Sequence, residues 1–209
     1  MSTINTNQPF TMSLTNSECE CSVDFCLCQY KNIIRPLIAA ILNADKNEYT
    51  YRSTIFGNQD PEYIHNLEIA HKIRQFQMKE GVIAQTCFGK FDGWQDLGIG
   101  HSSGLDCMKL DGSVIIELKN KHNTCNSGGK NSVLDKLAKY KIEHPETKCV
   151  WGIVNPTHGC RQLTQKIIHM GVEIYKIQGR DLFRLVYEVD GNDYSDEVIK
   201  FVKEVMHPH

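Results

Sequence analysis

The sequence predicts an α/β (α+β) protein with a central mixed β-sheet flanked by helices and preceded by an N-terminal helical region. A near-continuous apolar run at residues 149–154 is typical of a strand that is covered on both faces. The dipeptide Asp111-Gly112 is a two-residue turn signal that joins two short stretches into a β-hairpin. Apolar residues at helical spacing occur before and after these strands, so helices are expected on both sides of the sheet.

The chain of 209 residues suits one main domain. We expect residues 1–21 to form a loose arm and residues 22–209 a single domain, with a helical part at 22–80 and a sheet core with C-terminal helices at 81–209. No apolar stretch reaches the roughly 18–20 residues that span a bilayer. The first residues also lack the basic and apolar regions of a signal peptide. The expected location is therefore intracellular, the cytoplasm.

Two helices are predicted in the first part of the chain. Val23–Leu42 has apolar residues at helical spacing, and Pro36 is expected to kink or divide this segment. A second helix is expected from about Glu62 to Lys79, with Pro61 near its first position and Gly81 just past its end. The following segment, residues 81–103, is interpreted as a loop that contains an edge strand.

The remaining elements follow from apolar patterns and from their glycine and proline boundaries. Gly171 is interpreted as the residue that closes a helix. The predicted elements are the edge strand Val82–Phe88, a helix at Ser132–Lys141, a strand at Cys149–Val154, a helix at Gly159–Met170, a strand at Val172–Ile177, and helices at Asp181–Tyr187 and Tyr194–Val205.

The hairpin places two acidic residues opposite each other. If Leu110 pairs with Ser113 across the turn, Asp106 lies directly opposite Glu117. Strand side chains alternate between the two faces, so Lys119 shares the face of Glu117. The other face should be core, with Leu105 opposite Leu118 and Cys107 opposite Ile116.

Two opposed carboxylates repel each other unless a cation lies between them. The acidic pair therefore suggests a divalent metal site with Asp106 and Glu117 as ligands, and with the backbone carbonyl of Leu118 as a further oxygen. Lys119 would orient or activate a water molecule or stabilise phosphate charge. This is the pattern of a metal-dependent phosphodiesterase of the form D-x10-E-x-K. The alternative is an ordinary exposed hairpin with charged side chains.

A basic and polar segment follows the hairpin. Residues 118–148 contain seven lysines and three acidic residues. A solvated helix face and a solvated loop are the alternative interpretations. The residues with donors suited to DNA are Asn120, Lys121, Asn123, Thr124, Asn126, Ser127 and Lys130.

Two further groups of residues are open to more than one interpretation. Glu68 lies at the edge of the apolar stripe of the second helix, where it is either a third catalytic carboxylate or a boundary residue beside His71. The cysteines of a C-x-C-x4-C-x-C cluster either bind zinc or are free thiols at a helix start. These cysteines are Cys19, Cys21, Cys26 and Cys28.

The stretch ELKNKHNTCNSGGKNSVLDKL, together with the preceding GLD, resembles the core of type II restriction endonucleases of the PD-(D/E)XK superfamily, in particular the family that cuts GGNCC-type sites. The resemblance implies a restriction-endonuclease-like fold and Mg²⁺-dependent cleavage of double-stranded DNA. It implies Asp106, Glu117 and Lys119 as the catalytic set, although Leu105 replaces the motif's leading proline. A homodimer is expected because a palindromic site matches a two-fold axis.

A cognate DNA methyltransferase is also implied as a functional partner. Two alternatives stay open at this point. One is a repair or junction nuclease of the same fold, which would recognise DNA structure rather than sequence. The other is a non-catalytic DNA-binding or zinc-binding module that keeps the hairpin.

Overall fold

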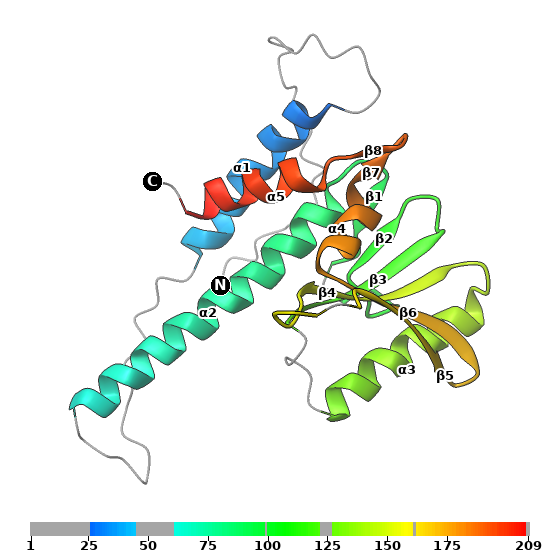
Figure 1. Cartoon of the computed structure of the whole chain (residues 1–209), viewed down its shortest axis with the longest axis horizontal. Coiled ribbons are helices and arrows are strands. Elements are labelled where there is room, and N and C mark those ends of the chain that lie inside the picture. Colours follow the sequence, from blue (N-terminus) through cyan, green and yellow to red (C-terminus); the bar gives the residue numbers. More distant parts are fainter. Residues whose placement is uncertain (1–25, 45–60, 99, 122–126, 161, 208–209) are drawn as a thin grey trace, which may run out of the picture.

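The computed structural model describes residues 26–44, 61–98, 100–121, 127–160 and 162–207. Two N-terminal helices precede a mixed sheet, and further helices cover that sheet (Figure 1). The elements in chain order are α1 (Leu27–Asn43), α2 (Pro61–Gly89), β1 (Trp94–Asp96), β2 (Cys107–Lys109), β3 (Val114–Lys121), α3 (Ser127–Glu143), β4 (Lys148–Asn155), β5 (Thr164–His169), β6 (Val172–Gln178), α4 (Gly179–Tyr187), β7 (Glu188–Val189), β8 (Asn192–Asp193) and α5 (Ser195–Met206).

The main sheet has six strands in the order β1-β2-β3-β4-β6-β5. Strands β3, β4 and β6 run parallel, whereas β1, β2 and β5 pair antiparallel with their neighbours. Helix α3 packs on one face of this sheet, and helices α1, α2, α4 and α5 contribute to the core on the other face. The predicted fold class, a mixed sheet between helices, is therefore confirmed.

The central strands are buried because both of their faces are covered. Residues 114–118 of β3 and 149–153 of β4 are all buried, and the predicted strand at 149–154 is confirmed. Parallel neighbours need a crossover connection, and α3 supplies it between β3 and β4. Strand β3 thus lies in the middle of the molecule, with its last residues at the end where β4 also ends.

The predicted hairpin register is confirmed. Cys107 pairs with Ile116, and Gly112 adopts a positive φ of 71° in the turn. The predicted position of Leu105 is wrong, because it packs with Ile115 and α3, whereas Leu118 belongs to the core on the opposite face. Strand β2 begins only at Cys107, so the alternation of faces does not extend back to residue 105.

Helix α2 is longer than predicted. It continues through Gly81 to Gly89, so Gly81 does not end it and residues 82–88 are not an edge strand. The reason lies in tertiary packing. Residues 83, 84, 87 and 88 recur at helical spacing, and all four are buried in the last turns of α2, three of them in the core on the α2 face of the sheet.

The predicted helix at residues 159–170 is also wrong. This region contains strand β5, whose residues alternate between exposed and half-buried and which pairs antiparallel with β6. Met170 and Gly171 both have positive φ values, 50° and 77°, as a two-residue hairpin turn with matching twist requires. Gly171 is therefore a turn residue and does not cap a helix.

The other predicted elements are confirmed within the described residues. Helix α1 is continuous through Pro36, so the proline does not divide it. Helix α3 starts earlier than predicted, and β6, α4 and α5 lie where the pattern placed them. No helix in the described part of the chain is long and apolar enough to cross a membrane. Residues 1–21 lie outside the described residues, so the domain boundary stays a prediction.

Candidate active site

The carboxylate of Asp106 lies beside the β3 backbone at Leu118, close enough to Glu117 for the two charges to interact. The Asp106 backbone N–H donates to Ile116 O at 3.0 Å, so Asp106 is attached to the same β3 residue that pairs with Cys107 at the start of β2. The Leu118 N–H donates to Asp106 Oδ2 at 2.6 Å. These two bonds hold the Asp106 side chain beside the strand that carries Glu117 and Lys119.

Glu117 is buried, with 4% of its surface exposed, and its two carboxylate oxygens have different surroundings. Lys119 Nζ donates to Oε1 at 2.7 Å, and Lys136 Nζ of α3 lies 3.6 Å from the same atom. The other oxygen, Oε2, is buried and has no hydrogen-bond partner among the described residues. A buried carboxylate oxygen without a donor is costly, and a bound cation is one way to compensate it.

The electrostatics of the pair also favour a cation. Burial raises the pKa of Asp106 above its usual value, and the nearby charge of Glu117 raises this pKa further. The Leu118 N–H, Lys119 and Lys136 act in the opposite direction, but they do not cancel the rise. Ionised Asp106 is therefore disfavoured beside Glu117, and a divalent ion at the pair would reverse that preference.

The donor set fits a hard cation such as Mg²⁺. Asp106 and Glu117 supply carboxylate oxygens, and the C=O of Leu118 leaves β3 on the same side as its N–H, toward Asp106. Among the described residues no group of three or more His, Cys, Asp or Glu side chains is placed to bind a metal ion. The remaining positions would be taken by water, which Mg²⁺ commonly retains in protein sites.

The structure does not bring Glu68 to this pair. Glu68 is half-buried on α2 and makes no hydrogen bond or ion pair with any described residue. The α2 carboxylate that contacts β3 is Glu80, whose Oε2 accepts from Asn120 Nδ2 at 3.2 Å. Twelve helical residues separate the two acids, a rise of about 18 Å. The role of Glu68 as a third catalytic carboxylate stays a prediction without geometric support.

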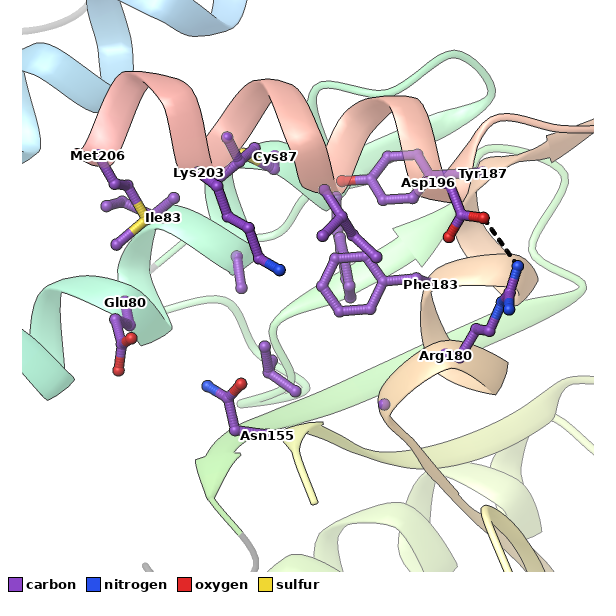
Figure 2. A pocket seen from close by; sticks show the side chains of 16 residues that line it. Glu80, Ile83, Cys87, Asn155, Arg180, Phe183, Tyr187, Asp196, Lys203 and Met206 are labelled. Carbon is purple, nitrogen blue, oxygen red and sulfur yellow. Dashed lines mark hydrogen bonds and ion pairs between the residues drawn. The ribbon is translucent and has the colours of Figure 1, made fainter. Parts of the chain in front are cut away.

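Asn120, a predicted DNA contact, is engaged inside the protein. Its amide nitrogen donates to Gln77 O at 2.6 Å as well as to Glu80, and its oxygen accepts from Asn155 Nδ2 at 2.6 Å. These bonds join the end of β3 to α2 and β4. Figure 2 shows Glu80 and Asn155 at one end of a pocket on this side of the sheet.

The other predicted DNA contacts are only partly described. Lys121 ends β3, and Lys130 is exposed near the start of α3. Residues 122–126, which include Asn123, Thr124 and Asn126, lie outside the described residues, and of Ser127 the structure describes only its place as the first residue of α3. Cys26 and Cys28 are described and form no disulfide, whereas Cys19 and Cys21 are outside the described part, so the zinc prediction is not tested.

The pocket in Figure 2 is separate from the acidic pair. It encloses about 360 Å³ between α2, α4 and α5, and side chains such as Ile83, Phe183 and Tyr187 make its walls apolar. At its rim the Arg180 and Asp196 side chains form an ion pair at 2.8 Å. None of the residues that line it belongs to the acidic pair or its lysines, so it does not form part of the candidate active site.

The sequence pattern did not single out Lys136, although it belongs to the lysine-rich segment. Only its spacing offered a signal: Lys136 lies beside the buried stripe of α3, which includes Val133 and Leu137. That spacing places it near the sheet without indicating which strand residue it meets. The sequence analysis therefore missed one of the two lysines around Glu117.

Comparison with known proteins identifies a family. A family model described as Eco47II restriction endonuclease matches residues 29–199, a range that contains the acidic pair and both lysines. The type II restriction enzyme Sau96I from Staphylococcus aureus is 28% identical over 71 residues. That match covers 34% of this chain and 26% of the relative, so it spans about a quarter of the relative's length.

Proposed function

Because the chain belongs to the Eco47II restriction endonuclease family, we propose that it is a type II restriction endonuclease that hydrolyses phosphodiester bonds in double-stranded DNA with Mg²⁺. The observation that carries this proposal is the buried Glu117, whose Oε2 has no partner among the described residues and whose charge lies near Asp106. Membership of this family implies that the protein cuts DNA at a specific sequence. The recognition sequence that we expect from the sequence resemblance is of the GGNCC type.

Asp106, Glu117 and the carbonyl of Leu118 would hold the Mg²⁺ ion. When bound, the ion supplies charge neutralisation at the phosphate and a lower pKa for a coordinated water. The Leu118 N–H keeps the Asp106 carboxylate oriented, because it donates to Oδ2 at 2.6 Å. The ordered backbone of β3 therefore sets the direction of one ligand and supplies another.

Lys119 would handle the attacking water and the phosphate. Its ammonium group is 2.7 Å from Glu117 Oε1, on the face that carries the acidic pair. An ammonium group has three donors, so Lys119 can also donate hydrogen bonds to a water molecule or a phosphate oxygen. Donation to the phosphate would stabilise the negative charge that increases in the transition state.

DNA would approach the end of β3 and the start of α3. Lys121 and the exposed Lys130 flank the segment between these two elements and would contact phosphates. We include Asn123, Thr124, Asn126 and Ser127 as DNA contacts on the basis of their side-chain donors. Asn120 belongs to the same segment, but its described hydrogen bonds support a role in holding β3 against α2.

We also propose a homodimer, in which each subunit cuts one strand of a palindromic site. A cognate DNA methyltransferase would protect the host's own sites. Both proposals follow from the family rather than from contacts within this chain.

The proposed function is tested by incubating the purified protein with plasmid DNA and Mg²⁺ and sequencing the ends of the products. Discrete fragments with a shared site at their ends are expected. Cleavage of branched or damaged DNA alone would identify a structure-specific nuclease instead. Tight DNA binding without cleavage in any divalent ion would identify a non-catalytic binding module.

Two variants test the assigned residues. Glu117→Ala removes a metal ligand and Lys119→Ala removes the water- or phosphate-orienting ammonium, so each should reduce cleavage by at least about 10²-fold. Circular dichroism should show that both variants stay folded. Cleavage at the normal rate by either variant would show that the active site lies elsewhere.

A further inference from the structure

We propose that Lys136 of α3 is a positioning residue of the acidic centre, whose ammonium group holds Glu117 Oε1 and the Gly104 carbonyl so that Oε2 of Glu117 faces the metal position. The effect of Lys136 on catalysis rests on the proposed function. The contact itself can be tested without any activity.

The first step of the argument is where the ammonium group lies. Lys136 Nζ donates to Gly104 O at 3.0 Å and lies 3.6 Å from Glu117 Oε1. Gly104 precedes Asp106 by two residues and has a positive φ of 62°, a backbone conformation that favours glycine. One side chain from α3 thus joins the segment that carries Asp106 to the strand that carries Glu117.

The second step concerns the orientation of Glu117. Both lysines approach the same oxygen, Oε1, whereas Oε2 is buried without a partner among the described residues. A carboxylate held at one oxygen by two cations has little freedom to rotate. Lys136 and Lys119 together therefore present Oε2 in a defined direction.

The third step concerns charge. Lys119 uses one of its three ammonium donors on Glu117, and sharing its positive charge with a water molecule or a phosphate weakens that contact. Glu117 is buried, and a buried carboxylate without a counter-charge is strongly unfavourable. Lys136 is anchored at Gly104 O, so its positive charge stays beside Glu117 when Lys119 also binds a water molecule or a phosphate. The second lysine thereby permits the first to take part in the reaction.

A double-mutant cycle on the full chain without metal tests the contact. Lys136→Met should lower the thermal unfolding midpoint in the wild-type background and lower it clearly less in the Glu117→Gln background, because the substitution then removes no ion pair. Lys200→Met, which changes an exposed lysine of α5, is the matched control and should act equally in both backgrounds. Equal losses for Lys136→Met in both backgrounds would overturn the proposal.

Single-turnover cleavage at saturating DNA and Mg²⁺ tests the consequence. Lys136→Met should slow cleavage about 10- to 100-fold with unchanged DNA affinity, and Lys136→Arg should restore most of the rate. A wild-type rate for Lys136→Met would overturn the positioning role. If the wild-type protein cuts no DNA, the proposed function fails, whereas the cycle still decides whether Lys136 holds Glu117.

Discussion

At the scale of single residues, the acidic centre places two carboxylates where they oppose each other and where solvent does not screen them. Glu117 is buried, and burial together with the charge of Glu117 raises the pKa of Asp106. A folded-state pKa above the unfolded value means that ionised Asp106 destabilises the fold as the pH rises through that pKa. The metal-free protein is therefore less stable at neutral pH than it would be with an uncharged Asp106.

Asp106→Asn should stabilise the metal-free protein at neutral pH, because the amide removes a charge while its oxygen still accepts from the Leu118 N–H. The gain should disappear at a pH below the unfolded pKa of about 3.9, where Asp106 is neutral in both states. Thermal unfolding at several pH values measures this difference.

Added Ca²⁺ gives the matching control. It should raise the unfolding midpoint of the wild-type protein and have little effect on Asp106→Asn, because the variant lacks one of the two carboxylate ligands. Asp92→Asn, at an exposed position, should change neither result. An Asp106→Asn variant that is less stable than the wild type at neutral pH would show that Asp106 and Glu117 do not repel each other.

At the scale of elements, α2 is the helix that connects the N-terminal region to the sheet. Its last turns are buried against the sheet, and Lys79 Nζ donates to Leu42 O and Ala44 O at 2.8 and 2.6 Å, which satisfies carbonyls at the end of α1. Asn120 holds the same region of α2 to β3. These contacts stabilise α2, so the helix continues through Gly81.

Two glycines of α2 should respond to alanine in opposite ways. A Cβ at Gly81 would lie 3.6 Å from the Asn120 Cβ, an ordinary contact, so Gly81→Ala should stabilise the protein by about 0.5–1 kcal/mol through the unfolded chain. A Cβ at Gly89 would lie 2.5 Å from the Asp96 backbone nitrogen. Gly89→Ala should therefore destabilise the protein by about 1–3 kcal/mol or more.

Urea unfolding of both variants measures these free energies, and the two proteins serve as controls for each other. Equal effects in the two variants would show that the close packing of α2 on β1 does not constrain residue 89. A destabilised Gly81→Ala variant would indicate that the helix is strained where it passes Asn120.

At the scale of the whole molecule, the sheet separates two regions with different roles. The acidic pair and α3 lie on one side, whereas the apolar pocket and helices α1, α2, α4 and α5 lie on the other. The first half of α2 projects from the body of the protein (Figure 1) and exposes apolar side chains such as Tyr63 and Ile73. Exposed apolar residues on a projecting helix are consistent with contact to another molecule.

The homodimer prediction belongs to this scale. Light scattering on the purified protein should give twice the chain mass of 23.8 kDa. Cleavage of a supercoiled plasmid should then produce linear DNA with little nicked intermediate, because two subunits cut the two strands in one binding event. A monomer that accumulates only nicked plasmid would contradict the prediction.

The sequence by itself determined the register of the hairpin and the residues that we propose for its chemistry. The Asp111-Gly112 turn and the period of two along a strand are local rules, and they were sufficient to pair Cys107 with Ile116 and to place Lys119 on the same face as Glu117. Strand β4, helix α3 and the C-terminal helices also followed from patterns within single segments. The motif that resembles restriction endonucleases also lies within one continuous segment of the chain.

Only the tertiary structure decided the features that depend on contacts between distant segments. Burial against the sheet extended α2 past Gly81, and pairing with β6 made residues 164–169 a strand rather than a helix. Helix packing brought Lys136, rather than Glu68, to the acidic pair. These outcomes depend on which distant segments pack against each other, and the periodicity within one segment does not show which other segment it will contact.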